Sequence, residues 1–304
     1  MNSKVLDTAL SIAAVERDTG LGKDTLRVWE RRYGFPSPLR DSNGERLYSM
    51  QQVERLRLIK RLMDHGHRPG KLVPASDEEL QRLCEVCEPP RAAATGGPVR
   101  DVLGLLRGND VAALRLTLNQ MMLRQGMQDF VLNTVPELNR EVGDAWMRGE
   151  LHIFEEHLYT EQIGMVLRQG IVNLPSGAGS PRILLTTVPE EQHGLGLLMA
   201  EALLALEGAC CVSLGTQTPL ADIRMAALSH GADIVALSFS AVYPARRIAP
   251  LLAELRGMLP EHIDIWSGGA GSARVNAADG IVPLLDMPSA LIALATWRAR
   301  RASL

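Results

Sequence analysis

The sequence has few cysteines, which limits the metal and disulfide chemistry open to it. Only four of its 304 residues are cysteine. Cys84 and Cys87 form one isolated Cys-x-x-Cys pair, and Cys210 and Cys211 are adjacent in a short apolar stretch. A structural zinc site would need further ligands beside the first pair, and a disulfide framework would need more cysteines. Neither is favoured.

The sequence also lacks long hydrophobic runs. It has no stretch of about eighteen apolar residues, the length of a membrane-spanning helix. No basic segment followed by an apolar one begins at Met1, so no secretory signal is indicated. We therefore expect a cytoplasmic protein without a membrane partner.

Net charge is small, but charge is unevenly distributed. The formal net charge is −3, whereas residues 1–72 alone contain 14 Lys and Arg against 9 Asp and Glu. The basic N-terminal part is the candidate for contact with phosphate groups. A solvated basic surface would have the same composition, so charge alone does not decide the function.

Length and composition predict several domains. A chain of 304 residues suits two or three domains, and a 46% hydrophobic content can fill a core in each. A stretch rich in Pro, Gly and Ala lies between a helical N-terminal part and a second helical region, and is typical of a linker. The predicted segments are a DNA-binding domain at 1–88, the linker at 89–98, a helical bundle at 99–176 and an α/β domain at 177–304.

The N-terminal part is patterned as helix, turn, helix and hairpin. Ser11 can cap a short helix, residues 19–22 form a turn, and a second helix is predicted from Lys23 to Tyr33. A hairpin is expected over 39–48, with its turn at an Asn-Gly pair. A capping box at Ser49 then opens a third helix, and a second box follows at Ser76.

This pattern resembles the winged helix-turn-helix of MerR-type transcription regulators. The similarity covers about the first seventy residues and includes the run 25–34, the hairpin as a wing, and the run 56–62. It implies that the second helix lies in the major groove of operator DNA and that the wing holds phosphates. The residues that the resemblance places there are Lys23, Thr25, Arg27 and Arg31 on the helix and Arg40, Arg46 and Tyr48 on the wing.

Residues 99–173 have helical periodicity throughout, with breaks near 108–110, 126 and 148–149. Four helices fit, which predicts a small bundle. Trp146 at the end of the third helix is followed after nine residues by Glu156 and His157 in the fourth. Taken singly, each has an ordinary explanation: an amphipathic tryptophan at a helix end, and a charged pair on a solvated face.

The C-terminal part alternates short apolar strands with helices, which is typical of a parallel, doubly wound sheet. Strands are expected at 182–188, 209–214, 234–238 and 262–266. His193 follows the first strand, at the edge where such sheets bind ligands, and there a histidine can offer a neutral ring nitrogen to a metal. A satisfied loop histidine is the alternative. Residues 215–219 follow the second strand and either border the ligand or only start a helix.

Three short motifs in this part resemble those of cobalamin-binding domains. They are Glu191-x-His193-x-x-Gly196, Ser238-Phe239-Ser240 and Gly268-Gly269. The resemblance implies that His193 is the lower axial ligand of cobalt, in place of the dimethylbenzimidazole base of the cofactor, and that Ser238 supplies a hydroxyl to the channel for the nucleotide tail. The sequence departs from the pattern at Ser240, where leucine is usual.

Taken together, the three parts resemble CarH/LitR-type cobalamin-dependent photoreceptor repressors. The resemblance implies that Trp146 covers the upper axial ligand and that Glu156 and His157 line the adenosyl pocket. The implied cofactor is adenosylcobalamin, with methylcobalamin as the other candidate. The implied partners are double-stranded operator DNA and further copies of the chain, as a dimer or tetramer. Light-sensing members can have a histidine beside the tryptophan that ligates cobalt after photolysis, whereas this sequence has Met147.

The sequence therefore predicts a regulator without catalytic residues, built of a winged helix-turn-helix, a four-helix bundle and a Rossmann-like cobalamin-binding domain. Light and adenosylcobalamin would control its oligomeric state and its affinity for the operator. Two alternatives stay open. One is a light-independent regulator that responds to the cobalamin level, another tetrapyrrole or a protein partner. The other is a corrinoid methyltransferase component, which the DNA-binding part disfavours.

Overall fold

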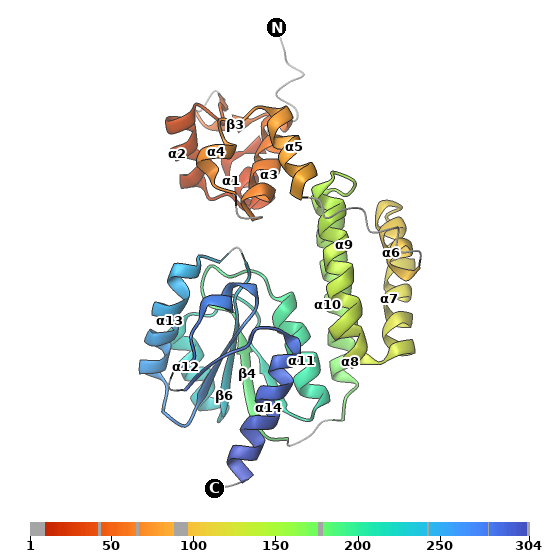
Figure 1. The fold of residues 1–304 in the computed structure, drawn as a ribbon, viewed down its shortest axis with the longest axis vertical. Coiled ribbons are helices and arrows are strands. Elements are labelled where there is room, and N and C mark those ends of the chain that lie inside the picture. Colours follow the sequence, from red (N-terminus) through yellow and green to blue (C-terminus); the bar gives the residue numbers. More distant parts are fainter. Residues whose placement is uncertain are drawn as a thin grey trace. The chain divides into compact units, whose positions relative to one another are not determined.

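A computed structural model describes residues 10–41, 44–64, 67–87, 97–175, 179–241, 243–278 and 280–302 of the chain (Figure 1). The chain divides into two compact units. The first comprises residues 1–95 and 144–153, and the second comprises 96–143 and 154–304. The four-segment division made from the sequence stays a prediction, and most of its linker lies outside the described residues.

The N-terminal part has the predicted helix-turn-helix and wing. The Oγ of Ser11 accepts a hydrogen bond from the N–H of Ala14 and so caps the first helix. The second helix ends where Gly34 takes the left-handed conformation that glycine allows. Ser42 and Asn43, at the predicted hairpin turn, lie outside the described residues. The elements are β1 (Leu10–Ser11), α1 (Ile12–Thr19), α2 (Lys23–Tyr33), β2 (Leu39–Arg40), β3 (Arg46–Tyr48), α3 (Met50–Asp64), α4 (Pro69–Leu72) and α5 (Asp77–Cys87).

The wing is a three-stranded antiparallel sheet in the order β1-β3-β2, and β1 was not predicted. Its Leu10 pairs with Tyr48 of β3. The two predicted capping boxes differ. At Ser76 both reciprocal hydrogen bonds with Glu79 form, whereas Ser49 only accepts the N–H of Gln52. The Gln52 amide instead makes two hydrogen bonds to the backbone of Ser37, which joins α3 to the segment that precedes the wing.

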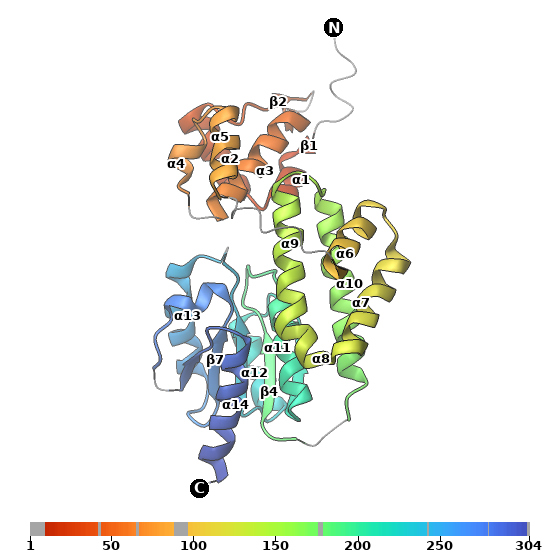
Figure 2. The same ribbon diagram turned by 45° about the vertical axis from the view of Figure 1, so that its right-hand side comes forward.

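Four helical segments follow, as predicted (Figure 2). The third contains a π-helical turn but runs without a break. Hydrogen bonds tie the segments together: Arg115 of the second donates to Gln162 of the fourth, and Tyr159 of the fourth donates to Asn139 of the third. The segments are α6 (Pro98–Arg107), α7 (Val111–Gln125), the run α8 (Met127–Asp129), η2 (Phe130–Thr134) and α9 (Val135–Met147), and α10 (Ile153–Val172).

The C-terminal part is a parallel sheet with helices on both faces. The strand order is β5-β4-β6-β7-β8, so the chain reverses its direction of winding between β4 and β6. The last strand was missed in the sequence because it has three residues and ends in proline. The elements are β4 (Arg182–Thr186), α11 (Leu195–Leu206), β5 (Cys210–Ser213), α12 (Leu220–Ser229), β6 (Ile234–Ser238), α13 (Ala245–Met258), β7 (Asp264–Gly268), η3 (Ala270–Arg274), β8 (Ile281–Pro283) and α14 (Met287–Ala302).

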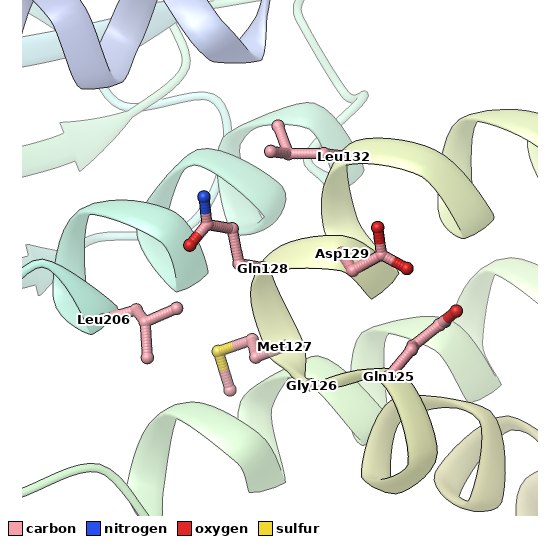
Figure 3. A pocket seen from close by; sticks show the side chains of 7 residues that line it. All are labelled: Gln125, Gly126, Met127, Gln128, Asp129, Leu132 and Leu206. Carbon is pink, nitrogen blue, oxygen red and sulfur yellow. The ribbon is translucent and has the colours of Figure 1, made fainter.

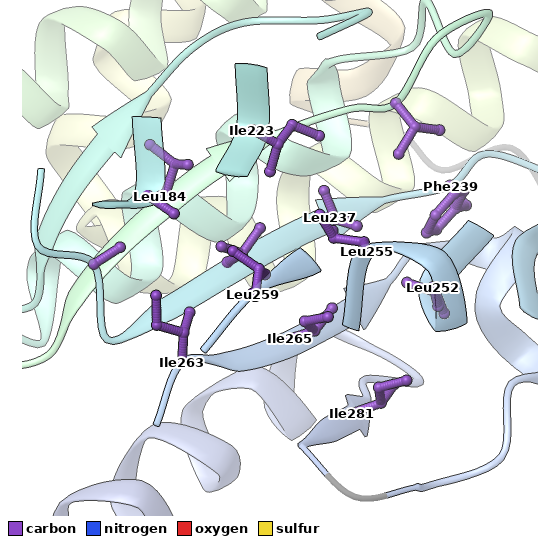
Figure 4. Close-up of a cluster of buried hydrophobic side chains, with 14 of the residues drawn as sticks. Leu184, Ile223, Leu237, Phe239, Leu252, Leu255, Leu259, Ile263, Ile265 and Ile281 are labelled. Carbon is purple, nitrogen blue, oxygen red and sulfur yellow. The ribbon is translucent and has the colours of Figure 1, made fainter. Parts of the chain in front are cut away.

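A hydrophobic cluster fills each face of this sheet. One cluster joins alternate strand residues such as Leu184 and Ile265 to Ile223 of α12 and Leu252 of α13 (Figure 4). The other lies between the opposite strand residues and α11 and α14, and it includes the fully buried Trp266. Because both faces are covered, the edges of the sheet are left for ligands. None of the described helices is long and apolar enough to cross a membrane.

The Gly-Gly pair closes the carboxyl edge by backbone packing. Gly269 has a φ of +88°, and a Cβ placed on it would lie 2.4 Å from the carbonyl oxygen of Phe239. Gly271 makes a similarly close contact, with a Cβ position 2.5 Å from the carbonyl oxygen of Ser240. The loop after β7 therefore contacts the loop after β6 at a distance that only glycine permits.

We expect Gly269→Ala to destabilise the protein by roughly 2–4 kcal/mol, because it adds left-handed strain to a clash with backbone. Gly257→Ala is the matched control. A Cβ at this exposed helical glycine meets nothing within 4 Å, so the change should be neutral or stabilising. Denaturant unfolding followed by circular dichroism measures both, and equal midpoints would contradict the close packing.

Candidate functional site

The predicted motifs converge at the carboxyl edge, at the point where the sheet reverses its winding. The His193 loop follows β4 and the Ser238 segment ends β6, its neighbour in the sheet. Ser238 pairs with Gly268 in the register of β6 and β7. A Cβ on Gly196, in the first turn of α11, would lie 3.6 Å from the Ser238 Oγ. Three segments that are distant in the sequence thus form one site.

Glu191 is the centre of this site. Its side chain is 1% exposed, and its carboxylate accepts four hydrogen bonds. Oε1 accepts the N–H of His193 at 2.9 Å and lies 2.7 Å from the His193 Nδ1. Oε2 accepts both the N–H and the hydroxyl of Ser240 at 2.8 Å each. The buried carboxylate therefore joins the loop after β4 to the loop after β6.

These hydrogen bonds control the ionisation of Glu191. Burial alone would raise its pKa, but the hydrogen bonds from His193 and Ser240 outweigh burial and lower the pKa to about 2. The carboxylate is thus ionised at neutral pH and can only accept hydrogen bonds. Nδ1 of His193 must then carry the ring proton, which places the lone pair of the neutral ring on Nε2.

The His193 ring is suited to hold a metal. Its side chain is 62% exposed at the ligand-binding edge, although its Nδ1 is fixed by a buried carboxylate. Metal-bound histidines commonly have this arrangement, in which a carboxylate on the other ring nitrogen sets the tautomer and the ring orientation. Imidazole nitrogen suits cobalt, so the residues present fit a corrinoid whose cobalt is open on one side.

Ser240 was noted in the sequence only as a departure from the leucine of the pattern. The structure places it differently, as the donor of two hydrogen bonds to Glu191. Thr187 was missed altogether. Its hydroxyl donates to the carbonyl oxygen of Glu191 at 2.6 Å and accepts the N–H of Gln217 at 2.8 Å. A pair of threonines at the end of a buried strand was the only sequence signal for this role.

The loop at 215–219 borders the His193 loop and also starts a helix. A Cβ on Gly194 would lie 3.0 Å from the methyl group of Thr216, so this contact restricts position 194 to a small residue. Pro219 caps α12, as the alternative interpretation expected. The carboxylate of the exposed Glu190 accepts two hydrogen bonds from Arg247 of α13, at 2.6 and 3.1 Å.

The predicted upper-face residues lie on two helices. Trp146 is half-buried in the last turn of α9, and the side chain of Met147 lies outside the described part of the chain. Glu156 and His157 lie in the first turns of α10, where the Glu156 Oε2 is 2.8 Å from the His157 Nδ1. The other carboxylate oxygen of Glu156 accepts the hydroxyl of Thr160 at 2.9 Å.

The structure shows how exposed the predicted DNA-contacting residues are, and their contact with DNA stays a prediction. Arg27, Arg31 and Arg40 are exposed, and Lys23 and Thr25 are half-buried on the same helix, α2. Arg46 of the wing makes an ion pair with Glu30 of α2 at 2.7 Å. The wing is therefore bonded to the helix that it flanks.

Tyr48 was placed on the phosphate-contacting surface, and this was wrong. Its side chain is completely buried, and its hydroxyl has no hydrogen-bond partner among the described residues. Burial raises its pKa, and the nearby Glu30 carboxylate adds to this. The unpredicted strand β1 is the reason, because it pairs Leu10 with Tyr48 and makes β3 the central strand of the wing.

A separate hollow of about 440 Å³ lies between the bundle and the far end of α11 (Figure 3). It contains Leu206 at the last turn of α11, whereas His193 precedes the first turn. It is therefore not part of the His193 site. No group of three or more His, Cys, Asp or Glu among the described side chains could hold a metal ion by itself. The remaining lining residues are Gln125, Gly126, Met127, Gln128, Asp129 and Leu132.

Comparison with known proteins identifies the family. The MerR HTH family regulatory protein model matches residues 10–72. The HTH-type transcriptional repressor CarA of Myxococcus xanthus is 31% identical over 269 residues, which cover 86% of this chain and 87% of CarA. The chain belongs to the CarA/CarH family of repressors. CarH of the same organism is 29% identical over 276 residues, covering 83% of this chain and 86% of CarH.

A solved structure has a fold similar to that of the second unit. The monomethylamine corrinoid protein of Methanosarcina barkeri superposes with a TM-score of 0.50 at 17% identity, over 64% of this chain and 96% of that one. At this identity the likeness shows the fold alone. A CarA/CarH-family chain thus combines a MerR-type DNA-binding head with the fold of a corrinoid protein, as the sequence predicted. Both of these relatives are named as HTH-type transcriptional repressors.

The ionisation of Glu191 gives a testable pH dependence. Because its pKa falls from 4.5 to about 2 on folding, the folded state gains about 3 kcal/mol above pH 4.5, and this gain is lost as the pH falls toward 2. In Glu191→Gln this contribution should be absent, and the amide nitrogen, itself a hydrogen-bond donor, would lie opposite the donors of His193 or Ser240. Urea unfolding between pH 6 and pH 2.5 should show that wild type and variant differ in their free energy of unfolding, and that this difference becomes smaller as the pH falls. A difference that does not change with pH would contradict the lowered pKa of Glu191.

Proposed function

We propose that this CarA/CarH-family chain is a transcriptional repressor whose oligomeric state and operator affinity respond to adenosylcobalamin and to light. The observation that supports this most is the Glu191–His193 pair. A buried carboxylate fixes one nitrogen of an exposed imidazole at the ligand-binding edge of a corrinoid-protein fold. A MerR-type head in the same chain would convert occupancy of that site into a change at DNA.

Each group of residues has a defined role in this proposal. His193 would hold the cobalt through Nε2 as its lower ligand, while Glu191 and Ser240 keep the ring in place. Gly196, Ser238, Gly268 and Gly269 would border the nucleotide tail of the cofactor. In this proposal Trp146 would cover the upper ligand, and Glu156 and His157 would line the adenosyl pocket. Adenosylcobalamin, or in its place methylcobalamin, supplies a cobalt–carbon bond that visible light breaks.

The proposed switch acts through assembly. Copies of the chain would join as a dimer or tetramer while the adenosyl group keeps the bundle in one position over the cofactor. Several heads in one assembly bind neighbouring half-sites with a high effective concentration, so the assembly binds operator DNA tightly and single chains bind it weakly. In this proposal residues 1–88 form the head, 99–176 the bundle and 177–304 the cofactor domain.

Two other functions are compatible with the fold. A regulator that responds to the cobalamin level or to another ligand would keep the same head and site without a response to light, and Met147 beside Trp146 favours that reading. A corrinoid methyltransferase component would share the second unit alone, and the MerR-type head argues against it.

The decisive experiment follows assembly and spectrum together. Purified protein with adenosylcobalamin is passed over a size-exclusion column in the dark and after green light, and its absorption spectrum is recorded in both states. We expect a larger species in the dark and a smaller one after light. His193→Ala should bind the cofactor more weakly and lose the spectral signs of imidazole coordination, with His262→Ala as an exposed histidine control. If the protein binds adenosylcobalamin but neither its size nor its spectrum responds to light, the light-independent regulator that senses the cobalamin level is the better proposal.

The DNA-contacting surface gives a paired prediction. Arg27→Ala should weaken operator binding and lower the slope of log K against log salt by about one, because one phosphate contact is lost. Tyr48→Phe should leave DNA binding unchanged and should stabilise the protein slightly or not at all, because it only removes a buried, unpartnered hydroxyl. Arg100→Ala, on α6, is the control for loss of an exposed arginine. If Tyr48→Phe binds the operator more weakly than wild type, the Tyr48 hydroxyl contacts DNA after all.

A further inference from the structure

The second helix of the DNA-binding head has an exposed valine among charged side chains. Among the side chains that the structure describes in residues 10–83, only two large apolar ones are exposed, Val28 at 41% and Leu39 at 55%. Val28 lies on α2 and Leu39 on β2 of the wing, so both lie on the elements proposed to contact DNA. The other large apolar side chains described there are buried or half-buried.

Helix geometry places Val28 on the outward face of α2. Leu26 and Trp29 of this helix are buried. Asp24 precedes Val28 by four residues and Arg31 follows it by three, so both lie on the same face as Val28. The side chain of Asp24 is 95% exposed, and Arg31 is also exposed. The face that contains Val28 is therefore turned away from the hydrophobic core of the head.

The wing does not cover Val28. Arg46 of the wing makes its ion pair with Glu30 of α2, at 2.7 Å. Glu30 and Val28 are two residues apart, a rotation of about 200° around the helix axis, so they lie on nearly opposite sides of α2. The wing is thus bonded to one side of the helix, and the Val28 side stays open to a partner.

The stability of the head does not explain a valine at this position. An exposed side chain adds little to the core, and a β-branched residue is a weaker helix former than alanine, lysine or glutamate. Single exposed apolar residues are common on proteins. This one, however, has Arg31 on its own face and Arg27 beside it, with 53% of the Arg27 side chain exposed. An apolar spot bordered by cations suits a groove of DNA, where phosphates surround the base edges.

The base edges in the major groove include one apolar group, the C5 methyl of thymine. The other groups there are hydrogen-bond donors and acceptors, which lose water without gaining a partner when an aliphatic side chain covers them. We propose that Val28 determines operator specificity by packing its methyl groups on the C5 methyl of a thymine. This proposal rests on the proposed function, in which α2 lies in the major groove of operator DNA.

The test removes the methyl group from the DNA. Full-length protein with adenosylcobalamin in the dark first selects its operator from DNA of random sequence. Each thymine of that operator is then replaced singly by deoxyuridine, which lacks only the C5 methyl, and binding is measured by fluorescence anisotropy. At one thymine of a half-site the wild type should bind about fourfold more weakly, as expected for one buried methyl group. Val28→Ala should bind both DNAs equally, Val28→Ile should keep the preference for thymine, and Leu123→Ala, on α7, is the exposed apolar control.

The outcomes separate this proposal from the proposed function. If wild type and Val28→Ala lose the same affinity at every deoxyuridine, or if neither loses any, Val28 does not read thymine, while the proposed function stands. If no sequence is enriched, the proposed function fails together with this proposal. Because no phosphate contact is lost, Val28→Ala should keep the salt dependence of the wild type, unlike Arg27→Ala. A changed salt dependence, or a lower unfolding midpoint by circular dichroism, would mean that the helix is distorted and would contradict a lost base contact.

Discussion

The site depends on one buried charge. Glu191 could not stay ionised in its position without donors, since transfer of a lone carboxylate into an apolar interior costs far more than a folded domain can offset. Its four hydrogen bonds come from only two residues, His193 and Ser240, which lie on different loops. Satisfying the charge therefore requires both loops to take one arrangement. The hydrogen bonds that stabilise the Glu191 carboxylate therefore also fix the orientation of the His193 imidazole.

The arrangement around Glu191 explains which parts of the site the sequence could reveal. The spacing of Glu191, His193 and Gly196 is local, so the sequence identified the candidate ligand and its loop. The role of Ser240 depends on a contact across 49 residues, which becomes visible only when β4 and β6 are neighbours in the sheet. The pairing of Glu156 with His157 lies between adjacent residues but depends on rotamers, which residue patterns do not specify.

In the fold, too, some elements could be predicted from the sequence and others could not. Helix boundaries with strong local signals, such as Lys23 to Tyr33 between two glycines, were predicted to the residue. The strands β1 and β8 were missed, because two or three residues carry almost no alternation signal and take their structure from the partner strand. The error at Tyr48 follows directly, since a residue at the edge of a two-stranded wing is exposed, whereas the same residue in a central strand is covered.

Two bonds in the N-terminal part determine how such a head would meet DNA. Arg46 ties the wing to Glu30 of α2, and Gln52 ties α3 to the backbone at Ser37, in the segment that connects α2 to the wing. In a DNA-binding head held together in this way, the distance between α2 and the wing, the two elements proposed to contact DNA, stays fixed. Any mismatch with the duplex must then be met by bending or untwisting the DNA, and the cost depends on the stiffness of the base steps in between. Such a head would select its operators partly by base pairs that no side chain touches.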